Sequence, residues 1–116
     1  MDDFRWLAVC AIGDVPEHSG VGVLLPGDRQ VAVFRTAGEA FYATSNVDPF
    51  SSAAVLCRGI VGDAAGVPVV ASPMHKQRFD LRTGHCLDAA DVAVARYEVT
   101  VDDGMVYVLA DEPTGV

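Results

Sequence analysis

The stretch that decides the fold runs from residue 70 to residue 84 and reads Val-Ala-Ser-Pro-Met-His-Lys-Gln-Arg-Phe-Asp-Leu-Arg-Thr-Gly. An apolar run ends at Ala71, and Pro73 opens an irregular loop because proline cannot donate to a strand ladder. The loop leads into residues 78–81 and then into the turn Thr83-Gly84, where glycine tolerates positive φ. This stretch predicts a strand that ends at Ala71, an irregular loop and a turn.

The rest of the chain consists of short β-rich runs separated by turn residues. We expect strands over residues 4–12, 21–25, 30–35, 39–44, 59–61, 67–71, 92–101 and 105–109. The turn sequences at 26–28 and 102–104 predict hairpins. Residues 45–52 read as a loop and residues 53–56 as one turn of helix. The pattern predicts an all-β fold, an antiparallel barrel or sandwich, formed by one domain over residues 1–116.

Composition and charge exclude several classes of partner. The 116 residues carry a net charge of −8, which does not supply the basic face that nucleic acids or anionic membranes require. The acidic surface indicates solubility, or docking onto a basic patch of another protein. The acidic start, Met1-Asp2-Asp3, is unlike a secretory signal, and no apolar run reaches the ~20 residues that span a bilayer. We expect a cytoplasmic protein without membrane contact.

The side chains that could carry chemistry do not form a recognisable set. Cys10, Cys57 and Cys86 are scattered and odd in number, without a Cys-x-x-Cys or Cys-x-His pair. Ser72 and His75 are close in sequence, but no Gly-x-Ser-x-Gly elbow surrounds the serine. We therefore predict no catalytic, cofactor-binding or metal-binding residue in this chain.

Two loops nevertheless have a recognisable arrangement. Asn46-Val47-Asp48-Pro49-Phe50 and the stretch from Val70 to Gly84 together resemble the Rieske pattern. In that family, Cys-x-His on one loop and Cys-x-x-His on the other hold a two-iron, two-sulfur cluster. The resemblance implies a Rieske-like all-β fold in which residues 46–84 correspond to the cluster-binding subdomain.

The ligand positions themselves have changed. The first loop places Asp48 where the family has Cys and Phe50 where it has His, and the second loop places Ser72 at the Cys position. Only His75 keeps a residue that can ligate iron. Because one iron takes both of its protein ligands as thiolates, we expect no cluster in this chain.

With these ligand positions changed, the chain resembles one particular family, the small subunit of the assimilatory NAD(P)H-dependent nitrite reductase. The likeness covers nearly the whole chain and is most specific at residues 46–50, 58–63 and 72–81. It implies a large-subunit partner that carries flavin, an iron–sulfur cluster and sirohaem and reduces nitrite to ammonium. This chain would then bind or stabilise that subunit without catalysis of its own. The alternatives are a Rieske-type ferredoxin that transfers electrons and a free-standing Rieske-like binding module.

The two loops offer a hypothesis about that contact. Phe50 and Met74 would be apolar anchors at the loop tips, because residues of these types favour interface cores. Phe50 could equally pack inward, as most phenylalanines do. For His75 we expect a hydrogen-bonding role that holds the loop in place.

Overall fold

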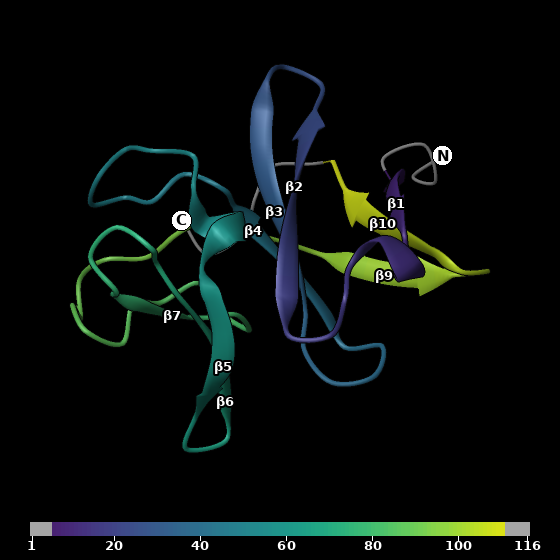
Figure 1. Ribbon diagram of the computed structural model, residues 1–116. Coiled ribbons are helices and arrows are strands. Elements are labelled where there is room, and N and C mark those ends of the chain that lie inside the picture. The colour runs from purple at the N-terminus through teal and green to yellow at the C-terminus, as the bar shows by residue number, and fades with distance from the viewer. Residues whose placement is uncertain (1–5, 111–116) are drawn as a thin grey trace.

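The computed structural model describes residues 6–110, which fold into three antiparallel β-sheets (Figure 1). The first sheet has the order β1-β10-β9, the second β2-β3-β4-β8 and the third β5-β6-β7. The strands are β1 (Trp6–Ala11), β2 (Ser19–Leu25), β3 (Arg29–Arg35), β4 (Phe41–Ser45), β5 (Ile60–Ala64), β6 (Val67–Ala71), β7 (Arg78–Asp80), β8 (Arg96–Tyr97), β9 (Val99–Asp102) and β10 (Met105–Leu109). Two 3₁₀ turns, η2 (Ile12–Asp14) and η3 (Leu56–Arg58), complete the regular structure of these residues. The predicted all-β, antiparallel architecture is confirmed.

Strand β3 lies between two hydrophobic cores and contributes side chains to both. Its four residues from Val31 to Phe34 are all fully buried. Val31 and Val33 point into one core, whereas Ala32 and Phe34 point into the other, since side chains alternate along a strand. A strand covered on both faces carries a continuous apolar run instead of an alternating pattern.

Each core lies between β3 and a different sheet. The first joins the second sheet to the first sheet and contains Val15, Leu25, Val31, Val33, Ala43, Tyr97, Val106 and Val108. The other joins the second sheet to the third sheet and contains Ala32, Phe34, Leu56, Val61, Val70, Phe79, Leu81, Cys86 and Val94. The third sheet and the loops around it therefore rest on the opposite side of β3 from β9 and β10.

The predicted hairpins are confirmed. Leu25 pairs with Arg29 across the turn at 26–28, and Asp102 pairs with Met105 across Asp103-Gly104. Asp103 and Gly104 both have positive φ, at 52° and 79°, as a tight two-residue hairpin turn requires.

Several predicted bounds were wrong, for reasons that lie in the tertiary structure. The run expected as one strand over 92–101 divides into β8 and β9, because the chain leaves the second sheet after Tyr97 and enters the first at Val99. The helical turn expected at 53–56 lies at 56–58 instead. The strand expected at 59–61 continues to Ala64, and the one expected at 39–44 begins only at Phe41. Phe4 lies outside the described residues.

Within residues 6–110, no helix has the length and apolarity that crossing a membrane requires.

The Thr83-Gly84 turn closes the segment that follows the second loop. Gly84 has a φ of 88°, and its N–H donates to the Asp80 carbonyl at 2.7 Å. The Val94 N–H donates to the Gly84 carbonyl at 2.8 Å, so the turn lies directly against the chain at 94. A Cβ at position 84 would lie 2.2 Å from the Val94 carbonyl oxygen.

Gly84→Ala should therefore lower the free energy of unfolding by about 2 kcal/mol or more, through backbone strain and the clash at Val94. Urea denaturation followed by circular dichroism measures this loss. Gly13→Ala is the matched control, because a Cβ at Gly13 would meet nothing within 4 Å, and its stability should change by less than about 0.5 kcal/mol. Equal stability of the two variants would contradict the role of Gly84.

Candidate functional site

The two loops singled out in the sequence share one backbone geometry. In the first loop, the Asp48 N–H donates to the Ala53 carbonyl at 2.9 Å and the Ser52 N–H donates to the Asp48 carbonyl at 2.8 Å. In the second, the Ser72 N–H donates to the Gln77 carbonyl and the Lys76 N–H to the Ser72 carbonyl, both at 2.9 Å. Ser52 and Lys76, at the equivalent corner, have φ of 64° and 65°. Each loop is therefore a closed turn that begins at its Asp48 or Ser72 position.

A buried polar network joins the two turns. The Ser72 hydroxyl donates a hydrogen bond to Oδ2 of Asp48, and both side chains are buried almost completely. The Phe50 N–H donates to Oδ1 of Asp48 at 2.8 Å, and the Met74 N–H donates to the Ser72 hydroxyl oxygen at 3.2 Å. Asp48 and Ser72 thus bind each other and hold the backbone of the residue two places further along each loop.

These are the two positions that the Rieske resemblance assigns to cysteines. The structure brings them into direct contact, although they are 24 residues apart in sequence. A hydroxyl that donates to a carboxylate makes a short, charge-assisted bond, which compensates for burying the carboxylate. In this structure the side chains at these two positions are therefore hydrogen-bonded to each other.

The loop tips present apolar side chains. Phe50 is 38% exposed and Met74 48% exposed. The Phe50 ring also packs against Phe79, with ring centroids 6.2 Å apart and tilted by 47°. Phe50 therefore packs against the core of the third sheet on one side, while part of its ring stays exposed.

His75 is exposed on the second loop. The hydrogen-bonding role expected for it stays a prediction. The loop is closed by the backbone and by Ser72, which begins the turn. His75, the remaining residue that could ligate iron, thus lies at the exposed surface of the second loop.

Asn46 organises the segment that leads out of the first loop, and sequence reasoning did not assign it this role. Its Oδ1 accepts from the Cys57 N–H at 2.7 Å and its Nδ2 donates to the Ala54 carbonyl at 3.4 Å. Its backbone carbonyl accepts from the Leu56 N–H at 3.0 Å. The signal in the sequence was an amide residue at the end of an apolar strand, since such side chains often cap irregular backbone.

Two arginine–aspartate ion pairs lie beside the second loop. Arg78 and Asp88 pair at 2.9 Å, and this hydrogen bond lowers the pKa of Asp88. Burial raises the pKa of Asp80, but the hydrogen bonds from Arg82 outweigh burial, so its pKa lies below the ordinary value. Both carboxylates therefore remain ionised at neutral pH and are matched by arginines.

The donor set does not fit an iron–sulfur cluster. Among the described residues, no group of three or more His, Cys, Asp or Glu side chains could hold a metal ion. Cys10 lies on β1, where burial raises the pKa of its thiol and disfavours the thiolate that metals bind. Cys57 and Cys86 are also free cysteines, and both lie outside the two turns.

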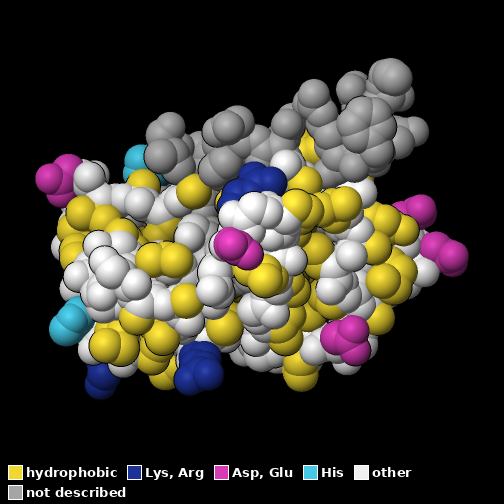
Figure 2. Space-filling view, turned by 90° about the horizontal axis from the view of Figure 1, so that it is seen from above, with side chains coloured by type: hydrophobic (Ala, Val, Ile, Leu, Met, Phe, Trp, Pro, Cys, Tyr) yellow, Lys and Arg dark blue, Asp and Glu magenta, His cyan; other side chains and the backbone are white. Residues whose placement is uncertain are grey.

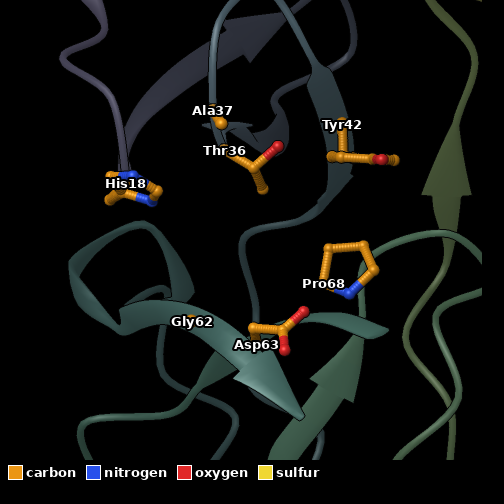
Figure 3. Close-up of a pocket in the computed structure, with 7 residues that line it drawn as sticks. All are labelled: His18, Thr36, Ala37, Tyr42, Gly62, Asp63 and Pro68. Atoms are coloured by element: carbon orange, nitrogen blue, oxygen red, sulfur yellow. The ribbon is translucent and has the colours of Figure 1, made fainter. Parts of the chain in front are cut away.

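A pocket of about 530 Å³ lies elsewhere, between the second and third sheets (Figure 3). Its lining residues are His18, Thr36, Ala37, Tyr42, Gly62, Asp63 and Pro68. Asp63, on the β5 side, already accepts a hydrogen bond from the Gly66 N–H at 2.9 Å. None of the loop residues assigned from the sequence lines this pocket.

Comparison with known proteins places the chain among Rieske-like proteins. The model of the Rieske-like [2Fe-2S] domain family matches residues 5–109. The chain is 43% identical over 103 residues to the nitrite reductase (NADH) small subunit of Escherichia coli K12, covering 88% of this chain and 94% of that protein. It is 40% identical to the nitrite reductase [NAD(P)H] small subunit of Erwinia carotovora, whose solution structure superposes with a TM-score of 0.79 over 93% of this chain and 83% of that one.

A second kind of relative is much longer. Over 103 residues the chain is 45% identical to the nitrite reductase [NAD(P)H] large subunit of Klebsiella oxytoca, covering 89% of this chain but only 11% of that protein. Ferredoxin components of dioxygenase systems also match, at 31–32% identity. The nitrite reductase small subunits are more similar to this chain than the ferredoxin components are, and they match it along nearly their full length. The chain therefore belongs to the Rieske-like domain family and, within it, to the nitrite reductase small subunits.

Proposed function

We propose that this chain is a cluster-free, non-catalytic component of an NAD(P)H-dependent nitrite reductase, which binds and stabilises the large subunit. The observation that carries the proposal is the buried hydrogen bond between Asp48 and Ser72. It takes the place of the metal link that would join the two loops in a cluster-bearing relative. The loop pair keeps its shape and its exposed tips without iron.

The chemistry of the side chains supports the absence of a cluster. A carboxylate, a hydroxyl and a phenyl ring replace two thiolates and one imidazole, and a phenyl ring cannot coordinate iron. His75 alone could hold one coordination position, which is too few for either iron. We infer that electrons do not pass through this chain.

The partner follows from the relatives. A nitrite reductase large subunit contains a segment like this chain within its own sequence, so the two parts occur together in one polypeptide. We propose that the large subunit supplies the flavin, the iron–sulfur cluster and the sirohaem, since reduction of nitrite to ammonium needs centres of suitable potential. We place this complex in the cytoplasm, where NAD(P)H is available.

A Rieske-type ferredoxin is the second candidate, because ferredoxin components share the fold and part of the sequence. A ferredoxin needs the cluster, and the residues at positions 48, 50 and 72 cannot hold one. The subunit function therefore has the stronger support.

Reconstitution with iron and sulfide tests the absence of the cluster. The wild-type chain should remain colourless and bind no stoichiometric iron. The triple variant Asp48→Cys, Phe50→His, Ser72→Cys, which restores all four ligand types together with His75, should gain visible absorption and iron. Iron and acid-labile sulfide analysis measures both. Stoichiometric iron in the wild-type chain would contradict the proposal.

Co-expression of the large subunit with and without this chain tests its role in the complex. Nitrite-dependent NAD(P)H oxidation should be lower when the chain is missing, because the large subunit loses a stabilising partner. Adding back the purified wild-type chain, without restored cluster ligands, should be enough to restore activity. Activity and thermal stability of the large subunit that are independent of the chain would contradict the role.

A further inference from the structure

Exposed apolar side chains are concentrated in one half of the molecule. We call residues 46–91 the loop half and residues 6–45 with 92–110 the sheet half. Of the large hydrophobic side chains that are exposed among residues 6–110, the sheet half contributes only Leu24. The loop half contributes Val47, Phe50, Ile60, Met74 and Leu87. Exposed apolar residues that gather in one region are typical of an interaction surface.

Charge is divided between the same two halves. The sheet half carries seven carboxylates against three arginines, whereas the loop half carries five carboxylates against four basic residues. Within the loop half, the Asp48 side chain is buried and hydrogen-bonded. Asp80 forms an ion pair with Arg82, and Asp88 forms one with Arg78. In Figure 2, hydrophobic side chains lie across the whole of this face, acidic side chains lie at both ends and in the centre, with more of them toward the right, and the basic and His side chains lie toward the left and the centre. The loop half is therefore apolar and close to neutral.

The apolar tips are held in place before any partner binds. Asp48 fixes the backbone of Phe50, Ser72 fixes the backbone of Met74, and the two turns are joined through their side chains. Phe50 rests on Phe79 of β7, and the Leu87 N–H donates to the Arg78 carbonyl of the same strand at 2.8 Å. A surface that is already ordered loses little conformational freedom on binding.

We propose that Phe50, Met74 and Leu87, which we call the loop-tip surface, bind the nitrite reductase large subunit, and that the facing surface of that subunit is apolar and uncharged. This proposal rests on the proposed function. The large subunit is the partner that the relatives indicate, since one of them contains a segment like this chain within a large subunit. The acidic sheet half would face a basic patch, whereas the near-neutral loop half fits an apolar one.

Ionic strength separates these two ways of docking. Contacts between apolar surfaces depend little on salt, while attraction between an acidic face and a basic patch is screened within about 10 Å at 0.1 M salt. We expect the dissociation constant of the complex to change less than about threefold between ~0.1 and ~0.5 M NaCl. A strongly salt-dependent affinity would assign the contact to the sheet half and overturn the proposal.

The direct test measures binding of the purified chain to the large subunit from the same organism by calorimetry. The double variant Phe50→Ser, Met74→Ser should weaken binding by about tenfold or more, because truncating central apolar anchors removes most of their contribution. Leu24→Ser is the matched control. It removes a side chain that is 64% exposed on β2, and it should change the affinity less than about twofold.

A second variant keeps the test valid if the loss of Phe50 disturbs the packing on Phe79. Met74→Ser with Leu87→Ser leaves the aromatic pair intact and should weaken binding to a similar extent, with an unchanged melting temperature. Unaltered affinity in both double variants, or an equal loss in Leu24→Ser, would overturn the loop-tip surface while leaving the subunit function intact. Self-association of the isolated chain through these tips, with unaltered affinity for the large subunit, would overturn it as well. Failure of the wild-type chain to bind would instead contradict the proposed function.

Discussion

The hydrogen bond from the Ser72 hydroxyl to the Asp48 carboxylate connects two loops that come from distant parts of the chain. A fully buried carboxylate destabilises a fold unless its oxygens are satisfied, and here the donors are Ser72 and the Phe50 N–H. If either loop moved, a buried charge would lose a partner. Because the same two side chains bind the backbone at Phe50 and Met74, this polar network fixes the position of two exposed apolar side chains.

The network works because the loops stand on a rigid base. Strand β3 separates the two cores, and its Phe34 belongs to the core that also contains Leu56, Val70 and Phe79. Those residues lie next to the two loops or beneath their tips. Gly59 allows the end of η3 to approach β6, since a Cβ there would lie 2.4 Å from the Ala71 carbonyl oxygen. The apolar core thus sets the distance between the loops, and the buried hydrogen bond fixes their relative position.

The sequence allowed the all-β class and the two hairpins to be predicted, because turn residues are local signals. The division of residues 92–101 between two sheets was not predictable, since the change of sheet near Glu98 depends on which strands are already paired. The contact between Asp48 and Ser72 was also missed. Each residue was assigned as a lost ligand, but their mutual bond exists only after folding. The equivalent Asp48-Pro49 and Ser72-Pro73 starts were the available signal for two similar turns. The backbone bonds that close the second turn, between Ser72 and both Lys76 and Gln77, were likewise not predictable from local sequence.

A double-mutant cycle tests most directly whether the two loops are held by this bond. It compares the free energies of unfolding of the wild-type chain, Asp48→Ala, Ser72→Ala and the double variant in urea. For a buried hydrogen bond to a charged group, we predict a coupling free energy of about 1.5–3 kcal/mol between the two positions. Losses that add to within about 0.5 kcal/mol would show that the two residues act independently, and would contradict the replacement of a metal link by a hydrogen bond.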